Sequence, residues 1–581
     1  MNLRCRALGA LTVVAILATV GCGSDEPTAP VPPNAPIGVS AVAKSTSTVL
    51  ISFNSTAGDA SYDIERAEGA SGTFTAVTNV AAPAGAGAVT YTDQNLKVNT
   101  QYRYRVFANK GGLKSSASSE VSVTTLQFGN AAADITADIT ASRTLFADTA
   151  YTLKGFIHVL NGATVTIQPG TTIKGDFNTL GSAMMFMRGS KIQAVGTVDA
   201  PIVFTSSRPV GQRQPGDWGG LLFIGNAIDN RSGTVLVEGT GTDGTAIVSG
   251  KNYPVQYNGG TVASDNSGTM TYVRVEFAGF APIQDQEFNS FTFCALGSGT
   301  RFSYLESLSP LDDAFEFFGG GFDIDHLIAF ETADDMFDMS EGWSGRMQYL
   351  IGINTTQLTP RTGAGFTSVD IEGIENDGCN GTGCDNGFDT QPFTIPLVAN
   401  FTLIGCGQSS CVGASGGHGM MLRRGTGGYY VNGVVARWPT DGVSLRDAAT
   451  FTRAGTSRTP GASADLQVKN ILFAEVNNAM FQATSATQFD LDPTGNALTL
   501  STATAASLFT AIPAVGTTPA SLAAFDFSPP AGSALASGGL STFTGSIATK
   551  AGTFVTATAY RGAVDPNGPK WWLGWTSYGR N

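Results

Sequence analysis

The sequence contains few charged residues, and basic residues are the scarcer kind. Only 33 of the 581 residues are lysine or arginine, against 46 aspartate and glutamate residues, which gives a formal net charge of −13. Nucleic acids and anionic membrane surfaces are bound by basic patches, so we expect neither as a partner. Histidine occurs only three times, which argues against a histidine-rich zinc site or a haem protein.

Long apolar runs are also lacking. Beyond the N-terminus, no apolar stretch reaches the roughly 20 residues that a helix needs to span a bilayer. The hydrophobic content is an ordinary 42%, and the 72 glycines do not follow the G-X-Y period of collagen. The length is sufficient for several domains. The composition therefore predicts a folded, β-rich protein that works outside the cell.

The first residues have the pattern of an export signal. Arg4 and Arg6 precede an apolar run at residues 7–20. This run is too short to span a bilayer, and a basic start followed by a short apolar segment is typical of a secretory signal peptide. We therefore predict that residues 1–21 are removed on export.

A cysteine follows the signal peptide directly. The segment Thr19-Val20-Gly21-Cys22 resembles a bacterial lipobox, in which the cysteine is lipidated after cleavage. Residues 22–34 are polar and rich in proline, which predicts a tether. The residue after the cysteine is Gly23 rather than aspartate, which resembles the signal that sorts lipoproteins to the outer membrane. We expect a protein that is anchored in outer-membrane lipid through Cys22 and exposed at the cell surface.

Four of the remaining cysteines form two C-x4-C pairs, Cys379 with Cys384 and Cys406 with Cys411. Four thiolates can bind zinc, but zinc pairs are usually spaced more closely and an exported protein meets an oxidising environment. Two short-loop disulfides are the favoured interpretation, although four cysteines allow three connectivities. Cys294 lies in an apolar stretch and is predicted to be a buried free thiol.

Residues 35–126 contain short strands with alternating apolar residues and glycine-rich turns. Alternation over Val49–Phe53, Tyr62–Ile64 and Tyr102–Val106 is typical of an antiparallel sandwich. The pattern resembles a fibronectin type III domain, with Phe53 at the position of the core tryptophan of that family. The resemblance implies a recognition module or, as we favour, a spacer; residues 127–143 are then a linker.

From residue 144 short β runs recur without helical stretches between them, which indicates a solenoid. The segment 311–317 aligns with 333–339 at an offset of 22 residues, and the same offset pairs Leu305 with Leu327 and Leu308 with Phe330. About 22 residues make one coil of three short strands, each coil about 4.8 Å above the last. We predict an all-β chain: a fibronectin III-like sandwich followed by a right-handed parallel β-helix with loop insertions over 144–560.

Two segments of this half are expected to differ from the regular coils. The stretch 482–545, rich in alanine, threonine and serine, is predicted to be an insertion or a loosely ordered flank. Residues 561–581 include Trp571, Trp572 and Trp575. Because a solenoid needs a cover over its last coil, we predict that this segment is a cap; stacking of the tryptophans on sugar rings is the alternative.

Three segments, Pro169–Gly175, Gly216–Gly220 and Asp312–Gly320, together with the terminal tryptophans, resemble a family of bacterial surface lipoproteins with pectin-lyase-like β-helices. The resemblance covers roughly residues 144–581. It implies the fold and a surface location, and no settled activity comes with it.

The acidic repeat is the main candidate for chemistry. If side chains alternate from residue 312 onward, Asp312, Ala314 and Glu316 share one face of the strand, and Asp313, Phe315 and Phe317 share the other. In the next coil Asp334, Met336 and Asp338 stack on the first set, and Asp335, Phe337 and Met339 stack on the second. The aromatic residues belong inside, so we place the four carboxylates together on the outer face.

Like charges on neighbouring strands are destabilising, and Ca²⁺, which takes six to eight oxygen ligands, is a reason for them to coexist. We therefore predict a calcium site at these four carboxylates. Four further acids, Asp323, Asp325, Glu331 and Glu341, are candidates to contribute from the turns. A solvated acidic stripe screened by salt is the alternative.

A catalytic interpretation is the second alternative. Polygalacturonase-like hydrolases use aspartates from successive coils with a Gly-His-Gly segment and a basic residue. Here Asp313 and Asp335 lie one coil apart, and His418 lies in Gly417-His418-Gly419, followed by Arg423 and Arg424. Such carboxyl groups can act as general acid and base.

The spacing does not support this interpretation fully. His418 lies 83 residues beyond Asp335 rather than one coil away, and a flexible loop histidine is the simpler explanation. A calcium-dependent lyase would use an arginine base, for which Arg346 and Arg423 are candidates.

The sequence as a whole predicts a surface lipoprotein with a non-enzymatic binding, adhesive or structural role, stabilised by Ca²⁺. Its predicted partners are outer-membrane lipid and a glycan or another surface protein. The alternative is a hydrolase or calcium-dependent lyase that degrades acidic glycans.

Overall fold

The computed structural model describes residues 31–579 except 45–47, 95, 98, 127–130, 241–253, 282–286, 357, 366–367, 369, 409–410, 412–415, 478 and 483–486. The predicted signal peptide, Cys22 and most of the predicted tether lie outside the described residues. No helix within the described ranges is long and apolar enough to cross a membrane. The chain divides into two units, the larger of which includes everything from Val123 onward.

The N-terminal strands form two small sheets. One contains β1 (Ile37–Ala43), β2 (Val49–Asn54) and β5 (Ala88–Asp93); the other contains β3 (Ser61–Glu68), β4 (Thr75–Ala81), β6 (Gln101–Lys110), β7 (Leu113–Lys114) and β8 (Val121–Thr124). The alternating apolar residues of β2, β3 and β6 are buried. Phe53 is buried, and its ring meets that of Tyr62 edge-on at 4.9 Å. These eight strands form the predicted fibronectin III-like sandwich.

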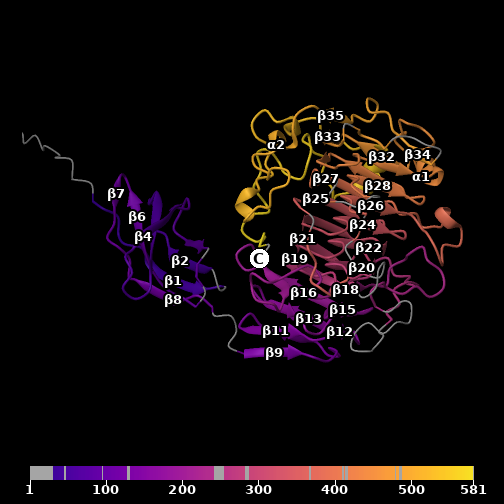
Figure 1. Cartoon of the computed structure of the whole chain (residues 1–581). Coiled ribbons are helices and arrows are strands. Elements are labelled where there is room, and N and C mark those ends of the chain that lie inside the picture. Colours follow the sequence, from indigo (N-terminus) through magenta and orange to yellow (C-terminus); the bar gives the residue numbers. More distant parts are fainter. Residues whose placement is uncertain are drawn as a thin grey trace, which may run out of the picture. The chain divides into compact units, whose positions relative to one another are not determined.

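The larger unit is built on two long sheets whose strands stack in chain order (Figure 1). The first sheet consists of β9 (Ala131–Ile135), β10 (Arg143–Leu145), β11 (Thr149–Leu153), β13 (Thr164–Ile167), β14 (Thr172–Gly175), β16 (Lys191–Val195), β17 (Ile202–Ser206), β19 (Gly268–Glu276), β21 (Arg301–Leu308), β23 (Asp323–Phe330), β25 (Arg346–Ile353), β27 (Leu397–Ile404), β29 (Gly428–Val431), β30 (Val434–Ala436), β32 (Leu466–Lys469), β33 (Leu472–Ala474) and β35 (Thr499–Ser501).

The second sheet receives one strand from each coil. Its strands are β12 (Phe156–Val159), β15 (Ala183–Phe186), β18 (Gly220–Ile224), β20 (Phe291–Leu296), β22 (Phe315–Gly320), β24 (Phe337–Ser340), β26 (Ile374–Asp377), β28 (Met420–Arg423), β31 (Ser444–Arg446) and β34 (Gln488–Phe489).

The pairing of these strands is that of a parallel β-helix. Each strand pairs in parallel with its counterpart in the next coil, apart from β34, which pairs antiparallel with β31. The register matches Leu305 with Leu327 and Leu308 with Phe330, as the 22-residue offset predicts. In the first coils two short strands, such as β16 and β17, occupy the place that one long strand, β19, takes later.

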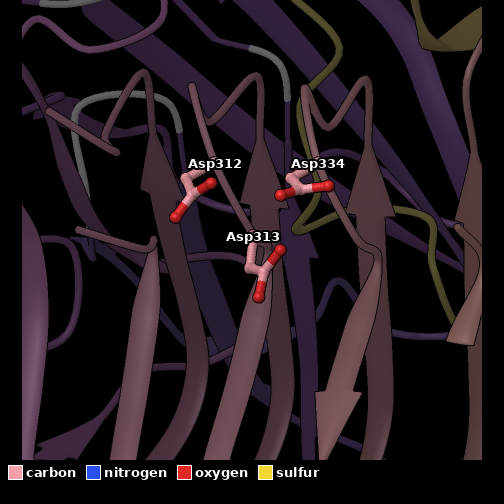
Figure 2. Close-up of side chains that lie close together, drawn as sticks. All are labelled: Asp312, Asp313 and Asp334. Atoms are coloured by element: carbon pink, nitrogen blue, oxygen red, sulfur yellow. The ribbon is translucent and has the colours of Figure 1, made fainter. Parts of the chain in front are cut away.

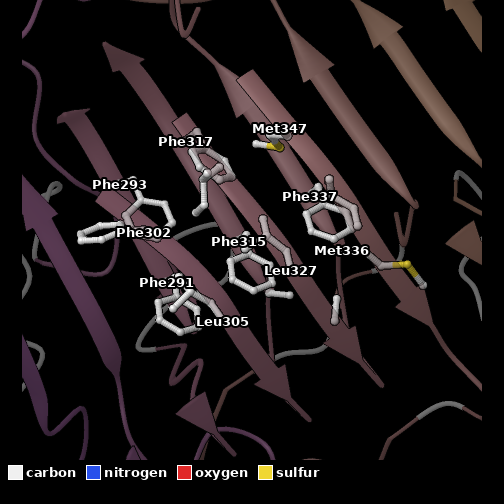
Figure 3. Packing of buried hydrophobic residues seen from close by; sticks show 14 of the residues in the cluster. Phe291, Phe293, Phe302, Leu305, Phe315, Phe317, Leu327, Met336, Phe337 and Met347 are labelled. Carbon is white, nitrogen blue, oxygen red and sulfur yellow. The ribbon is translucent and has the colours of Figure 1, made fainter. Parts of the chain in front are cut away.

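The space between the sheets is filled by apolar side chains in stacked rows (Figure 3). Phe291, Phe315 and Phe337 follow one another on successive coils, with nearly parallel rings 5.0 and 5.5 Å apart. Stacking identical or similar side chains from coil to coil fills the interior and buries aromatic area. The predicted Phe315–Phe337 ladder is confirmed.

The long strands of the first sheet bend at one residue with positive φ in each coil. Tyr272, Tyr304, His326, Tyr349 and Asn400 have φ between 53° and 66°. Non-glycine residues seldom adopt this conformation, and asparagine does so most readily. Tyr272 stacks on Tyr304 at 4.5 Å, and Tyr304 on His326 at 4.2 Å. The bends therefore place a column of aromatic rings on the outside of the sheet.

The C-terminal segment packs against this column. Trp575 contacts the rings of Tyr272 and Tyr304, and Trp571 contacts His326, so the segment lies beside the coils of β19, β21 and β23. The predicted cap over the last coil is therefore wrong. The segment buries its tryptophans against the apolar outer face of the middle coils.

The stretch 482–545 packs into the same apolar cluster as the C-terminal segment, on the outer side of the first sheet. It includes β35, α2 (Ala505–Leu508) and the start of α3 (Gly545–Ala551), while α1 (Ala448–Arg453) follows β31. Leu508, Phe525, Phe527 and Leu535 are buried against the outer side of the first sheet. In the described part of the stretch the apolar residues are thus ordered by packing, and β35 pairs in parallel with β33 as a further strand of the first sheet. The predicted loose order is therefore not found there.

The cysteines pair within each C-x4-C loop. Disulfides join Cys379 to Cys384 and Cys406 to Cys411. Cys294 in β20 is a buried free thiol, as predicted. The zinc alternative for these cysteines is excluded because their sulfur atoms are bonded to each other.

Candidate metal centre

Carboxylates from three successive coils gather where the chain enters the second sheet. Each coil supplies acids from the turn before the strand and one from the strand itself, because β22, β24 and β26 stack in register. We call the following eight residues the acidic ladder: Asp312, Asp313 and Glu316 of the first coil, Asp334, Asp335 and Asp338 of the second, and Glu372 and Glu375 of the third.

The ladder contains four groups of three carboxylates whose oxygen atoms lie within 4.8 Å of one another. Between the first two coils these groups are Asp312–Asp313–Asp334, shown in Figure 2, and Asp313–Glu316–Asp338. Between the second and third coils they are Asp334–Asp335–Glu372 and Asp335–Asp338–Glu375. The arrangement of the first pair of groups is thus repeated one coil later.

Hydrogen bonds from the backbone hold the turn acids in place. The N–H of Asp313 donates to Asn289 Oδ1 at 3.0 Å, the N–H of Asp335 to Asp313 Oδ1 at 2.8 Å, and the N–H of Glu372 to Asp335 Oδ1 at 2.6 Å. One oxygen of each aspartate is therefore used to fix the next coil. The other is left for the interior of the ladder.

The ladder is largely buried. Asp334 and Asp338 are half-buried, and the other six residues are buried. Burial raises the pKa of every carboxyl group in the ladder well above its ordinary value, and the neighbouring carboxylates raise it further. The site therefore strongly disfavours its own negative charge unless protons or a cation compensate it.

Several carboxylate oxygens of the ladder have no hydrogen-bond partner among the described residues. Both oxygens of Glu372 lie fully buried and accept no hydrogen bond, and one oxygen each of Asp334 and Asp338 is in the same state. Buried polar groups are nearly always satisfied in native proteins. These unpaired oxygens, which face other carboxylates, can accept a proton or bind a cation.

Among the described residues, arginine ion pairs border the ladder at its third coil. Arg423 pairs with Glu375 and, at 2.9 Å, with Asp377, and Arg424 pairs with Asp377. A pocket of about 170 Å³ opens here and is lined by Arg231, Asp338, Glu375, Asp377 and Arg424, among others. The two arginines pair with acids of the third coil, and the charge of Arg423 also partly offsets the rise in the pKa of Asp338 in the second coil.

The four carboxylates predicted from the sequence do come together, but the predicted alternation is wrong before residue 315. Ala314 and Met336, placed with the acids by simple alternation, point into the core. Asp313 and Asp335, placed inside, belong to the ladder. The reason is that the extended strand begins only at Phe315, so the preceding turn does not follow the period of two.

The predicted contributions from the turns are not found. Asp323 forms an ion pair with Arg346 at 2.6 Å, Asp325 pairs with His326, Glu331 accepts from Thr355 and Tyr578, and Glu341 pairs with Arg231 at 2.5 Å. None of them is in the acidic groups found among the described residues. The alternative of a solvated stripe is also wrong, because six of the eight carboxylates are buried.

His418 lies next to the ladder, contrary to the prediction of a flexible loop histidine. It is buried, and its carbonyl accepts the N–H of Gly373. Its Nδ1 lies 2.9 Å from Asp441, and Arg446 contacts its Nε2 at 3.2 Å. A guanidinium only donates, so Nε2 accepts and Nδ1 carries the proton toward Asp441. Both ring nitrogens are thus occupied.

The arginines nominated for a lyase have structural partners as well. Arg346 is held by Asp323 on the first sheet and is in none of the ladder contacts. The carboxylates of Asp377 and Glu375 raise the pKa of Arg423 above its ordinary value despite its burial. A guanidinium that is paired in this way does not readily give up a proton.

Sequence reasoning did not find Glu372 and Glu375. They stand opposite Asp335 and Asp338 in the next coil, but an inserted loop after β25 lengthens the offset from 22 to 37 residues, as the pairing of Asp338 with Glu375 shows. The run of acids in Asp370–Asp377 was the available signal.

Comparisons with known proteins agree with this architecture. The chain is similar to the exopolygalacturonase of family 28 from Yersinia enterocolitica, at 12% identity over 76% of this chain and 79% of that chain, with a TM-score of 0.23. Its N-terminal part is similar to the FN1–FN3 domains of chicken CNTN1 (21% identity, 16% of this chain and 32% of that chain, TM-score 0.14). It is also similar to a Fn3-like protein from Clostridium thermocellum (28%, 15% and 86%, TM-score 0.14).

TM-scores of this size support no functional argument, and the chain spans about a third of the CNTN1 structure. No curated protein matches the chain. The family model described as a pectate-lyase-like β-helix domain matches residues 137–515. The matched range contains the stacked coils and the whole acidic ladder, and the chain therefore belongs to the pectate-lyase-like β-helix family.

Proposed function

We propose that this chain is a calcium-binding surface lipoprotein whose β-helix has a non-enzymatic binding, adhesive or structural role. The observation that carries the proposal is the acidic ladder: carboxylates repeated over three coils, mostly buried, with unpaired oxygens. Such a cluster is destabilising when it is ionised and empty. A bound cation turns the same carboxylates into a link between the coils.

Calcium fits the donors better than other cations do. All ligands in the ladder are carboxylate oxygens, which suit hard cations, and the site has no cysteine or histidine ligand among the described residues. Two oxygens bound to one Ca²⁺ at about 2.4 Å lie at most about 4.8 Å apart. The three oxygens of each group satisfy this condition, and several carboxylates supply the irregular coordination that calcium accepts.

The repetition of the groups supports more than one ion. The two groups between the first and second coils recur between the second and third, and the two sets share Asp334 and Asp338. Two ions one coil apart, bridged by shared aspartates, would balance more of the charge than a single ion. We therefore expect a stoichiometry of at least two.

Calorimetric titration of the purified protein with Ca²⁺, together with thermal unfolding in EDTA and in millimolar Ca²⁺, tests this function. The melting temperature should rise with Ca²⁺, because binding to the folded state alone stabilises it by RT ln(1 + [L]/Kd). The variant with Asp312→Asn, Glu316→Gln, Asp334→Asn and Asp338→Asn should lose the rise and the binding heat.

The matched control changes four acids outside the ladder, Glu120, Asp134, Asp148 and Asp389, to their amides. It removes the same charge from exposed positions and should keep the calcium response. If Ca²⁺ gives neither heat nor a change in melting temperature with the unmodified protein, the metal proposal is wrong. If both variants lose the response equally, the effect is one of net charge and the ladder is not the site.

The anchoring part of the proposal rests on the lipobox-like segment that ends at Cys22. Growth with a labelled fatty acid should mark the unmodified protein, and Cys22→Ala should abolish the label and release the protein from the outer-membrane fraction. Protease treatment of intact cells then tests surface exposure. Label on the Cys22→Ala variant would contradict the anchor.

A second candidate function is the degradation of acidic polysaccharides, since the pectate-lyase-like family includes polysaccharide-degrading enzymes. The specific observation in its favour is that Asp313 and Asp335, one coil apart, both neighbour Asp338 at the pocket beside Arg424. Release of reducing or unsaturated ends from acidic glycans should then disappear in Asp313→Asn and Asp335→Asn. His418→Ala, in contrast, should act through stability, because both nitrogens of His418 have partners.

A further inference from the structure

A pocket of about 350 Å³ lies on the outside of the first coils, away from the acidic ladder. It is formed between the outer face of β11 and β14 and the loop that follows β17. Its polar lining consists of the side chains Lys174, Arg208, Arg213, Thr149, Thr172 and Ser207. In a chain with a net charge of −13, a pocket lined by three cations and no carboxylate is a distinct feature.

The positive charge of this pocket is only partly balanced. Arg208 and Arg361 share the buried carboxylate of Asp217, each at 3.4 Å. Arg213 and Arg274 share that of Glu276, at 3.6 and 3.1 Å. Four guanidinium groups thus face two carboxylates.

A third carboxyl group does not remove the surplus. Glu306 lies 3.8 Å from Arg274, and burial raises its pKa well above the ordinary value. Asp148, beside the pocket, is exposed and accepts the hydroxyl of Thr149. The basic side of the pocket therefore keeps a net positive charge.

Lys174 adds a further positive charge to the lining of the pocket. It lies half-buried in β14 between the inward-facing Ile173 and Gly175, so its side chain lies on the outer face. Among the described residues its ammonium group has no hydrogen-bond or ion-pair partner. An ammonium with three free donors, next to two guanidinium groups, is suited to an anion that carries several oxygens.

The rest of the lining favours an anion attached to a sugar over a bare ion. Thr172 and Ser207, which carry hydroxyl groups, line the same pocket as the cations, and Ala150, Pro209 and Val210 complete the lining. Hydroxyls pair with sugar hydroxyls, and apolar side chains cover the C–H face of a ring. A volume of about 350 Å³ accommodates a monosaccharide with one anionic group.

We propose that this pocket binds a monosaccharide unit that carries a phosphate or sulfate group, either free or at the end of a glycan. The anion lies against Lys174, Arg208 and Arg213, and the sugar ring lies toward Thr172 and Val210. The site is independent of the acidic ladder and of calcium. The β-helix thereby binds an anionic ligand, which the carboxylates of the ladder would repel.

Isothermal titration of the purified protein in EDTA tests the proposal with four probes: glucose 6-phosphate, glucose 6-sulfate, inorganic phosphate and glucose. We expect saturable binding of at least one of the two anionic sugars, weaker binding of inorganic phosphate and none of glucose. Raising the salt concentration should weaken the binding, since it rests on charge.

Two variants locate the site, and a third serves as control. Lys174→Gln should weaken the anionic sugar about tenfold, as expected for a lost charge-assisted hydrogen bond. Thr172→Val should weaken the sugar but not inorganic phosphate. Lys191→Gln, a half-buried lysine of the neighbouring strand β16 outside the pocket, should bind as the unmodified protein does, and all three should keep the melting temperature measured without ligand.

Each contrary result overturns a defined part of the proposal. No saturable binding of either anionic sugar, or equal binding by glucose, overturns it completely. Unchanged binding by Lys174→Gln, or an equal loss in Lys191→Gln, places the site elsewhere. If inorganic phosphate binds as tightly as the sugars and Thr172→Val has no effect, the pocket is an anion site without specificity for sugar. Comparison of the phosphate and sulfate probes decides which anion it takes.

Discussion

At the scale of single residues, Glu306 shows what burial of a carboxyl group does to stability. It is fully buried, its oxygens accept the N–H of Ser577, and burial raises its pKa well above the ordinary value. Between the unfolded and folded pKa values the folded protein holds more protons than the unfolded chain. The free energy of unfolding therefore falls as the pH rises, by up to about 1.4 kcal/mol per pH unit.

The variant Glu306→Gln should lose this part of the pH dependence, because a glutamine does not titrate and still offers an oxygen to Ser577. The acidic ladder contributes equally to both proteins, so the difference in unfolding free energy between them isolates Glu306. Urea unfolding in EDTA at pH 4.5, 5.5 and 6.5 should show the variant gaining on the unmodified protein as the pH rises. Parallel pH profiles would exclude the raised pKa.

Asp335 has two roles that two substitutions separate. Its Oδ1 accepts the N–H of Glu372, and its charge belongs to two groups of the ladder. Asp335→Asn keeps the acceptor and removes the charge, so in EDTA it should be at least as stable as the unmodified protein. Asp335→Ala leaves a buried N–H unpaired and should cost about 1–3 kcal/mol.

Both Asp335 variants should bind Ca²⁺ more weakly, which titration calorimetry measures beside urea unfolding. If Asp335→Asn is as destabilised as Asp335→Ala, the charge itself stabilises the apo protein, and our view of the ladder as a repulsive cluster is wrong. If neither variant alters calcium binding, Asp335 is a structural residue only.

At the scale of elements, the sequence predicts what repeats and misses what interrupts the repeat. The 22-residue offset predicts the register of β21 with β23 and of β22 with β24. The apolar residues recur at the same spacing in both coils, and stacking the coils in register buries both sets. Glu372 and Glu375 escape this reasoning since the loop after β25 changes the offset. Asp313 escapes it because a turn, in which side chains do not alternate, precedes the strand.

The C-terminal segment could not be placed from its sequence at all. Its tryptophans indicate burial, but an apolar surface is offered by the end of a solenoid and also by the outer side of β19, β21 and β23. The column of Tyr272, Tyr304 and His326 decides between them. That column forms because Tyr272, Tyr304 and His326 have positive φ in successive coils. Tyrosine and histidine seldom adopt this conformation, so the sequence does not predict it.

Removing Trp575 tests this placement. Trp575 is fully buried, lies 5.6 Å from the ring of Tyr272, and donates its indole N–H to the carbonyl of Trp571 at 2.9 Å. Trp575→Ala should cost about 3–5 kcal/mol of unfolding free energy. Leu573→Ala, at a neighbouring position that is 44% exposed, should cost less than about 0.5 kcal/mol.

Hydrogen exchange distinguishes the observed position of the segment from a cap. In Trp575→Ala the amides of β19 and β21 should lose protection first, since the segment covers these strands. Loss of protection confined to β33 and β35, at the C-terminal end of the stack, would instead support a cap over the last coil. Equal costs for Trp575→Ala and Leu573→Ala would show that the segment is not docked.

At the scale of the whole molecule, the two units should respond to calcium separately. The acidic groups found among the described residues all lie in the β-helix, while the fibronectin III-like unit has its own buried residues Ile51, Tyr62, Ile64 and Tyr104. A ligand stabilises only the folded unit that binds it. Differential scanning calorimetry should therefore show two transitions.

Of these transitions only the larger, which belongs to the β-helix, should move upward with Ca²⁺. Its shift should grow with the logarithm of the calcium concentration above Kd and vanish in the quadruple ladder variant, while the smaller transition stays in place. A smaller transition that moves in parallel would show that the units unfold together or that calcium also binds to the N-terminal unit. A larger transition that stays fixed would leave the ladder compensated by protons, and its stability would then depend on pH and not on calcium.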